Sequence, residues 1–438
     1  MSRSRLSALV VSAAVLLALT LVGRVMPWQT GNPDRFLPLA LMQGAAYLAA
    51  VWAVWKGHSS RRLVLGIAAV ALLARIPLVF LPPYLSSDVY RYVWDGRVQA
   101  AGINPYRYIP ADPRLEALRD TEVFPEINRA RTAVTIYPPV AEAIFLAVAR
   151  ISASVTGMKA AMIGFEMVTF VLLVRLLAAS GLPTERVAVY AWHPLTLWEF
   201  AGNGHIDAAL IALVVAAFAA ACHGRAVLTG VLLAGATLIK FYPAVLVPAL
   251  YRRWDWKMPA AFVAAIIVAY VPYLGVGWRV LGFLPSYVGE EGFDAGGAGF
   301  FLLGLFRELP PFAQISGPTY AAVAIAMLAA LGAAALLARD PKYSPFAAAA
   351  VLATAFMIAV SPHYPWYFSW LIIFACFVRS LALLWLTNAC LLLYLVPVGS
   401  QIVRDDHRLL IEAAVYGPFA ALALADLWYH RRVTRESP

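Results

Sequence analysis

Apolar segments long enough to cross a lipid bilayer recur along almost the whole chain of 438 residues. One helical crossing needs about 20 residues, and segments of that kind occupy residues 6–26, 36–55, 62–82, 134–152, 159–179, 226–251, 257–276, 318–338, 345–361, 365–379, 381–398 and 409–429. In lipid, backbone polar groups must bond within the protein, so only helices and closed barrels span a membrane. Segments of this length favour helices. The sequence predicts an all-α polytopic membrane protein with a single integral membrane domain over residues 1–438.

One apolar region, residues 187–222, is interrupted twice. The interruptions are Trp192-His193-Pro194 and Gly202-Asn203-Gly204-His205. The region can form two short half-helices or two tight spans, so we predict about 12 to 14 transmembrane helices in total. The first apolar segment lacks the small-residue cleavage site of a signal peptide, and we expect it to remain as the first helix.

The basic residues lie in short clusters between the apolar segments. Although the net charge is +10, these clusters follow the positive-inside rule and do not indicate a nucleic-acid partner. They lie at residues 3–5, 56–62, 252–257, 339–342 and 430–435. With these clusters in the cytoplasm, the third helix runs outward. The long loop of residues 83–133, a second loop at 277–317 and the motif at 361–366 are then all expected on the external face.

The loop of residues 83–133 is far longer than a simple connection needs. Apolar and aromatic residues at helical spacing predict a short amphipathic helix from Asp88 to Ala101. Further short helices are expected over 113–120 and 122–131. Asp88 stands at the start of this loop, where an apolar segment ends, and a carboxylate at a membrane boundary indicates a functional site.

Several motifs in order resemble a family of membrane enzymes. They are Ser87-Asp88-Val89-Tyr90-Arg91-Tyr92-Val93-Trp94-Asp95-Gly96, Gly102-Ile103-Asn104-Pro105-Tyr106, Ile136-Tyr137-Pro138-Pro139, Trp192-His193-Pro194, Gly202-Asn203-Gly204-His205-Ile206-Asp207, Lys240-Phe241-Tyr242-Pro243 and Ser361-Pro362-His363-Tyr364-Pro365-Trp366. Over residues 80–370 the chain resembles glycosyltransferase family 87, which has the GT-C fold and includes bacterial mannosyltransferases that use polyprenyl-phosphate-mannose. The chain departs from the general GT-C pattern in having two helices before the one that leads to Asp88.

The resemblance implies a membrane glycosyltransferase of the bacterial inner membrane, with its active site facing the periplasm or cell exterior. It would move a hexose, with mannose the first choice, from a polyprenyl-phosphate sugar donor to a glycolipid or glycan acceptor, with inversion. Membrane lipids would be its other partners. We expect neither a cofactor nor a metal, because a phosphate leaving group can be stabilised by protein cations. The three cysteines have neither a metal nor a redox spacing.

Asp88 is the candidate general base, which would accept the proton of the acceptor hydroxyl. The alternative is a helix cap for the helix that follows it. Asp95 returns to the same helical face seven residues later. The two carboxylates could bind a divalent metal or flank the acceptor sugar, but a solvated loop acid paired with Arg91 or Arg97 is the preferred interpretation of Asp95.

Three basic residues are candidates for binding the donor phosphate. Lys240 lies within apolar sequence and needs an anionic partner there, although a lysine can also extend to the membrane interface. His363 lies between two prolines in an aromatic stretch; it could hydrogen-bond the donor phosphate or pass the released proton onward, and an interfacial histidine is the alternative. Arg131, with its neighbour Arg129, precedes the Tyr137 turn, and a surface role is equally compatible with the sequence.

Further polar residues are predicted to contact substrate. His205 and Asp207 lie at the glycine-containing interruption, and Glu199 is a nearby acid in apolar sequence; broken helices in membranes often line substrate sites. Helix capping is the alternative. Tyr137 is either a substrate contact or part of a rigid Pro-Pro entry into a helix.

A transporter or lipid flippase is the main alternative from another class, because it too would contain broken helices and intramembrane charges. The sequence lacks an evident internal repeat, and the long loop carrying Asp88 favours an enzyme. A ligase or polymerase of lipid-linked glycans would also use large external loops, but no residue pattern favours it.

Overall fold

The computed structural model describes residues 2–26, 35–57, 59–290, 300–337, 345–396 and 406–436, and within these ranges the regular secondary structure is entirely helical. The first part of the chain forms α1 (Arg3–Val25), α2 (Phe36–Trp55), α3 (Arg61–Val79), α4 (Asp88–Ala100), η1 (Pro113–Leu118), η2 (Phe124–Glu126), α5 (Pro139–Ile151) and α6 (Val155–Ala179). The middle part forms η3 (Thr184–Val187), α7 (Ala188–Ala191), α8 (Pro194–Thr196), η4 (Leu197–Gly202), α9 (Asp207–Cys222), α10 (Ala226–Thr237), η5 (Tyr242–Leu246), α11 (Val247–Leu250), α12 (Lys257–Tyr270) and η6 (Val271–Leu281). The last part forms α13 (Leu284–Glu290), α14 (Phe301–Arg307), η7 (Pro310–Phe312), α15 (Gly317–Leu337), α16 (Pro345–Val360), η8 (Pro365–Leu371), α17 (Ile372–Ala375), α18 (Leu381–Ala389), η9 (Cys390–Leu395) and α19 (Asp406–Glu436).

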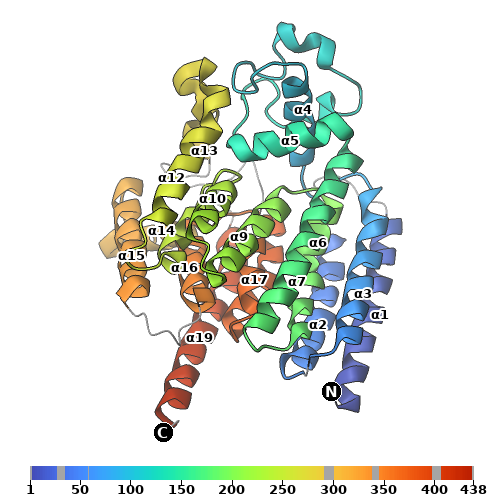
Figure 1. Cartoon of the computed structure of the whole chain (residues 1–438), viewed down its shortest axis with the longest axis vertical. Coiled ribbons are helices and arrows are strands. Elements are labelled where there is room, and N and C mark those ends of the chain that lie inside the picture. The colour runs from blue at the N-terminus through green and yellow to red at the C-terminus, as the bar shows by residue number, and fades with distance from the viewer. Residues whose placement is uncertain are drawn as a thin grey trace.

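The long helices form a bundle whose upper end is covered by α4 and α5, while α1 begins and α19 ends at the opposite end (Figure 1). Within the described ranges, seven helices are long and apolar enough to cross a membrane: α1, α2, α3, α6, Lys257–Tyr287, α15 and Arg408–Tyr429. Five shorter apolar helical stretches accompany them: Asp207–Cys222, Ala226–Thr237, Pro345–Val360, Pro365–Ala375 and Leu381–Leu395. The predicted all-α polytopic membrane protein is confirmed.

The helix α5 differs from the span predicted at residues 134–152. It begins at Pro139, the second proline of the pair, and has 13 residues, about 20 Å at 1.5 Å per residue, which is too short to cross the bilayer core. It packs on α4, where Phe145 stacks on Tyr92 with ring centroids 4.6 Å apart. A β-carbon at Gly96 would meet the Phe145 carbonyl at 2.5 Å. The apolar face that suggested a transmembrane span therefore covers another helix.

Most side chains of α4 are buried, including the apolar residues that predicted an amphipathic helix here. The helix is thus enclosed by the rest of the loop, α5 and α6, rather than resting on lipid with one face. The short helices predicted after it correspond to the 3₁₀ turns η1 and η2. Of the second predicted loop, residues 291–299 lie outside the described ranges.

The interrupted region 187–222 forms several short helical turns followed by one regular helix, α9. Its second interruption follows η4, which is a π-helix, a rare conformation that is frequent at functional sites. Just after η4, the Asn203 side-chain oxygen accepts hydrogen bonds from the backbone N–H groups of Tyr84 (3.2 Å) and Leu85 (3.1 Å). The interruption is therefore joined to the segment that leads into α4.

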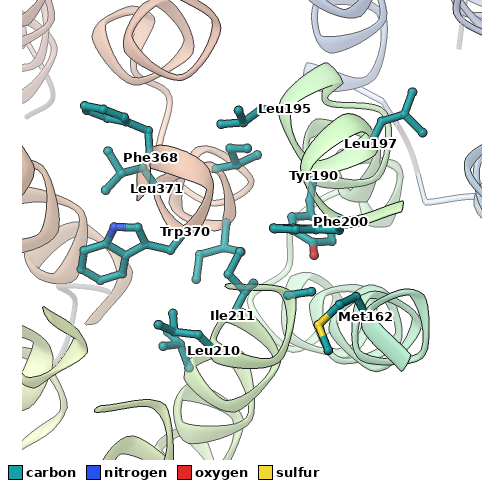
Figure 2. Close-up of a cluster of buried hydrophobic side chains, with 14 of the residues drawn as sticks. Met162, Tyr190, Leu195, Leu197, Phe200, Leu210, Ile211, Phe368, Trp370 and Leu371 are labelled. Atoms are coloured by element: carbon teal, nitrogen blue, oxygen red, sulfur yellow. The ribbon is translucent and has the colours of Figure 1, made fainter. Parts of the chain in front are cut away.

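The core lies where α9 meets the short helical turns that precede it, α6 and the η8–α17 segment (Figure 2). Large side chains such as Phe200, Ile211 and Trp370 are fully buried there. Because lipid is as apolar as these side chains, their packing rather than their removal from water holds the helices together. Alanines along α9 permit the neighbouring helices to approach closely.

Two buried cations connect α6 to the segment before Asp88. Arg75 on α3 makes a two-pronged ion pair with Glu166 on α6, with N–O distances of 2.8 and 2.5 Å. The Lys159 ammonium donates to the carbonyls of Leu78 (2.7 Å) and Leu81 (2.6 Å), which belong to the end of α3 and the residues just after it. Both cations have the partners that burial in a membrane requires, and they fix the position at which α4 begins.

Candidate active site

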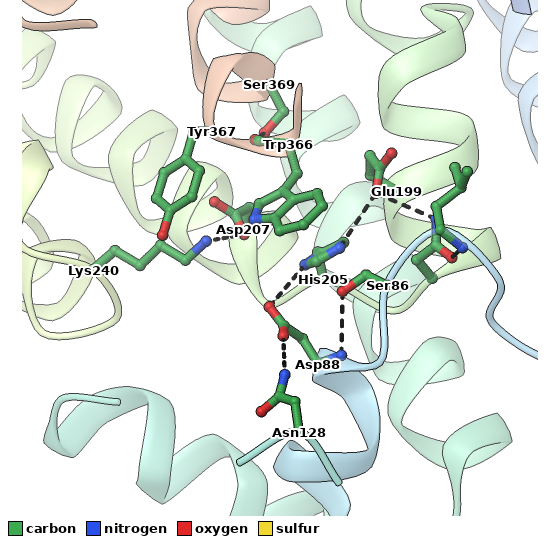
Figure 3. Close-up of polar contacts among 12 residues, drawn as sticks. Ser86, Asp88, Asn128, Glu199, His205, Asp207, Lys240, Trp366, Tyr367 and Ser369 are labelled. Atoms are coloured by element: carbon green, nitrogen blue, oxygen red, sulfur yellow. Dashed lines mark hydrogen bonds and ion pairs between the residues drawn. The ribbon is translucent and has the colours of Figure 1, made fainter. Parts of the chain in front are cut away.

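Asp88 is the first residue of α4, and its side chain points toward the helical bundle (Figure 3). The Asn128 side-chain amide donates a 2.8 Å hydrogen bond to Oδ1 of Asp88. Oδ2 lies 4.0 Å from Nδ1 of His205, and the Asp88 backbone N–H donates to Ser86 Oγ at 3.2 Å. These contacts direct the carboxylate toward other segments of the chain, which favours a site residue over a helix cap.

The surroundings of Asp88 affect its protonation. Burial raises the pKa of Asp88 above the ordinary aspartate value, and the charge of Lys240 and the hydrogen bond from Asn128 oppose part of that rise. A raised pKa makes the ionised carboxylate a stronger base. Such perturbation is common among catalytic carboxylates.

A cavity of about 1090 Å³ adjoins Asp88. Its charged and polar lining includes Asp88, Arg91, Asn128, Arg129, Lys240 and His363. Its apolar and aromatic lining includes Tyr137, Phe241, Phe283, Phe356, Met357, Val360, Tyr364, Trp366, Tyr367, Leu393, Tyr394 and Val396. A large, mainly apolar cavity with a few polar groups is typical of a ligand site, and these linings suit an amphiphilic ligand.

Lys240 lies just after α10 and is held at the cavity by a buried carboxylate. Its ammonium is 2.7 Å from Oδ2 of Asp207, the first residue of α9. The Tyr242 hydroxyl donates to the other oxygen at 2.8 Å. The ammonium also lies 4.3 Å from the centre of the Tyr367 ring. Asp207 is fully buried and does not line the cavity, so it positions Lys240, which does line it.

His205 and Glu199 lie behind Asp88 and are also fully buried. Nε2 of His205 is 3.3 Å from Oε2 of Glu199, and its ring stacks on Trp366 with centroids 4.2 Å apart. Glu199 in turn accepts hydrogen bonds from the Tyr394 hydroxyl and, at 3.3 Å, from Asn203. Neither His205 nor Glu199 lines the cavity. The sequence predicted substrate contacts for both, whereas the structure places them one layer deeper.

The remaining predicted residues divide into two groups. His363 and Tyr137 line the cavity, where a direct substrate contact is possible. Arg131 is exposed and outside the cavity lining, whereas Arg129, two residues earlier, lines it. The Arg129 guanidinium lies 5.7 Å from the centre of the Phe283 ring. We therefore transfer the predicted phosphate contact from Arg131 to Arg129.

Asp95 is buried below the cavity and does not line it. Its two carboxylate oxygens each lie 2.9 Å from Nε of Arg91, so Asp95 has one of its two predicted partners. The predicted exposure to solvent is wrong, because the packing of α4 buries Asp95. Arg91 also donates to the Ala133 carbonyl at 3.2 Å. Asp95 therefore positions a cavity-lining arginine, and a direct contact with substrate does not follow from its position.

Sequence reasoning missed several residues that complete the site. Asn128, Tyr367 and Tyr394 carry no motif of their own, and only folding brings them to Asp88, Lys240 and Glu199. Within the described part of the chain, no group of three or more His, Cys, Asp or Glu side chains could hold a metal ion.

A large cavity with a partly buried carboxylate, several basic residues and apolar walls, set in a bundle of apolar helices, is typical of a membrane protein with a ligand site. The chain belongs to the MptA_B family: the model of the alpha-(1->6)-mannopyranosyltransferase N-terminal domain matches residues 6–255, more than half of its length. Comparisons with curated proteins and with solved structures gave no match. The protein is thus a membrane glycosyltransferase of a mannosyltransferase family. The resemblance to glycosyltransferase family 87 stays a prediction.

Proposed function

We propose that this protein transfers mannose from a polyprenyl-phosphate donor to a hydroxyl group of a glycan or glycolipid at the external membrane face, within a GT-C architecture. The observation that carries the proposal is the position of Asp88. Its carboxylate, held by Asn128, borders the same cavity as Lys240 and His363. A base and phosphate-binding groups are the two requirements of this reaction.

The donor phosphate would be bound by Lys240, Arg129 and His363. An ammonium has three N–H donors, so Lys240 can hold a phosphate oxygen while it remains paired with Asp207. Arg129 and His363 add donors from the loop after α4 and from the segment before η8. The polyprenyl chain would lie along the apolar lining, which includes Phe356, Met357, Val360 and Leu393.

Asp88 would act as the general base. The acceptor hydroxyl loses its proton to the carboxylate as its oxygen attacks the anomeric carbon from the side opposite the phosphate. The bond between that carbon and the phosphate oxygen breaks, the configuration inverts, and the electron pair remains on the phosphate. Lys240, Arg129 and His363 stabilise the departing phosphate, because cations in a site shielded from water act strongly on developing charge.

The proposal is tested by measuring mannose transfer from polyprenyl-phosphate-mannose to a membrane lipid extract with purified protein. We expect the native chain to transfer mannose, and Asp88→Asn to lower the rate by about 10² to 10⁴, the usual contribution of a general base. Glu116→Gln, which removes an exposed carboxylate of the same loop, is the matched control and should retain full activity.

Two outcomes would contradict the proposal. Equal transfer by the native protein and Asp88→Asn would remove Asp88 from the mechanism. No transfer by the native protein from several lipid-linked sugars, together with movement of labelled lipid across reconstituted vesicles, would support the transporter alternative.

A further inference from the structure

His205 lies between two buried or partly buried carboxylates that belong to different segments (Figure 3). Its Nδ1 faces Oδ2 of Asp88 at 4.0 Å, and its Nε2 faces Oε2 of Glu199 at 3.3 Å. The His205 and Glu199 side chains are fully buried, whereas that of Asp88 is 23% exposed. The three side chains thus form a row that leads from the cavity wall into the protein interior.

The row is held in place at its inner end. The ring of His205 stacks on Trp366, and its backbone N–H donates to the Glu199 carbonyl at 2.9 Å. The Glu199 carboxylate receives hydrogen bonds from Tyr394 and Asn203. A neutral imidazole can accept a proton on one nitrogen and release one from the other. The two nitrogens of His205 face the two carboxylates, although neither makes a hydrogen bond in this structure.

We propose that His205 and Glu199 form a proton relay for Asp88, an inference that rests on the proposed transfer reaction. The proton of the acceptor hydroxyl first binds to Oδ2 of Asp88 while the hydroxyl oxygen bonds to the anomeric carbon. The step starts with Glu199 ionised and with the neutral His205 ring protonated on Nε2. The proton on Asp88 then passes to Nδ1 of His205, and the proton on Nε2 passes to Oε2 of Glu199. Asp88 is then ionised again, His205 is neutral, and Glu199 is a carboxylic acid.

The relay gives a role to Glu199, a buried acid that the transfer step itself does not use. While a lipid-linked product fills the cavity, water has little access to Asp88, and the interior route removes the proton. After product release the same steps in reverse return the proton through Asp88 to cavity water. Both contacts of His205 must tighten into hydrogen bonds for transfer, as catalytic hydrogen bonds often do only when substrate is bound.

The charged groups around His205 are Asp88, Glu199 and the Lys240–Asp207 pair, whose ammonium acts on His205 through space. Steady-state kinetics should compare His205→Gln, Glu199→Gln and the double variant. We expect kcat to fall about tenfold or more in each single variant, with both KM values unchanged, because a proton step rather than binding is impaired. The double variant should be no slower than the slower single variant, because both residues serve one route.

A second measurement does not depend on sugar transfer. The infrared carboxyl band of Asp88 is identified by its loss in Asp88→Asn. The pH midpoint of this band should shift in Glu199→Gln, and the shift should vanish when His205→Gln is also present. Glu116→Gln is the control and should leave the midpoint unchanged. A shift that persists without His205 would indicate direct charge interaction and overturn the relay. Full kcat in Glu199→Gln would overturn it as well. If the native protein transfers no mannose but the His205-dependent shift of the Asp88 band is seen, the proposed function is contradicted and the proton relay between Asp88 and Glu199 is not.

Discussion

At the scale of single residues, opposing influences act on the pKa of the Asp88 carboxylate. Burial raises its pKa, while Lys240 and Asn128 favour the ionised form. A base must be ionised to act, so transfer is lost as the pH falls through the raised pKa of Asp88. The acid limb of the pH–rate profile should therefore lie above that of a solvent-exposed aspartate.

Asn128→Ala should move this acid limb to still higher pH. The substitution removes a hydrogen bond to the ionised carboxylate, so the pKa of Asp88 rises further. The measurement is kcat/KM for mannose transfer as a function of pH in the native protein and the variant. A limb that stays in place, or one that moves to lower pH, would show that Asp88 is not the group that titrates.

Lys240→Gln should weaken donor binding. The loss of a charge-assisted hydrogen bond costs about 1.5–3 kcal/mol, which is roughly 10- to 150-fold in the donor KM if that contact is made. The single variant leaves the buried Asp207 carboxylate without its ion-pair partner, which endangers folding. The double variant Lys240→Gln/Asp207→Asn removes this charge and should restore thermal stability without restoring donor affinity. Recovery of donor affinity in the double variant would refute a phosphate contact.

The site residues differ in how far the sequence could predict them. Asp88, Lys240 and His363 stand out because charged or polar groups are rare in apolar sequence, and all three border the cavity. Sequence spacing could not tell Arg129 from Arg131, because both are exposed and the path of an irregular loop decides which of them borders the cavity. Nor could it place Asn128, whose partner Asp88 lies forty residues earlier in the chain.

At the scale of elements, the turn between η4 and α9 depends on one glycine. Gly204 has a φ of +77°, and a β-carbon there would lie 2.8 Å from Val89 and 3.0 Å from Lys159. Gly204→Ala should destabilise the protein by about 1–3 kcal/mol through backbone strain alone, with the overlap adding to this cost. It should also displace His205 and lower transfer.

The matched control is Gly66→Ala in the middle of α3, where a β-carbon meets nothing within 4 Å. This exchange should be neutral or stabilise the protein by about 0.5–1 kcal/mol, because alanine favours the helix. Thermal unfolding in detergent distinguishes the two variants. Equal stability would mean that the turn at Gly204 accommodates a side chain.

Element lengths explain where the fold could and could not be predicted. Long continuous apolar segments such as α2 and α6 begin and end within a few residues of their predicted bounds, since lipid leaves the backbone no alternative to a helix. α5 was overestimated because an apolar face that packs on another helix has the same composition as one that faces lipid. The π-helix η4 has no sequence signature and arises from tertiary contacts.

At the scale of the whole molecule, the candidate active site and the basic residue Arg252 lie at opposite ends of the bundle. Asp88 and the loop after it lie at the end covered by α4 and α5, and α1 begins and α19 ends at the other (Figure 1). α9 begins beside the site at Asp207 and ends at Cys222; its 16 residues span about 24 Å at 1.5 Å per residue. The basic residue Arg252 contacts this second end, where its side chain donates to the Ala221 carbonyl.

The native cysteines allow the predicted orientation to be measured. Among them, Cys222 is exposed, and Cys376 and Cys390 are buried. A membrane-impermeant maleimide applied to right-side-out vesicles should label a cysteine introduced by Glu116→Cys in the loop near Asp88, and should leave Cys222 unlabelled until the vesicles are opened. Inverted vesicles should give the reverse. The expectation follows from the positive-inside rule, because the basic clusters place the Cys222 end in the cytoplasm. Labelling of Cys222 from outside, with Glu116→Cys protected, would put the cavity on the cytoplasmic face and require a donor and acceptor from that side.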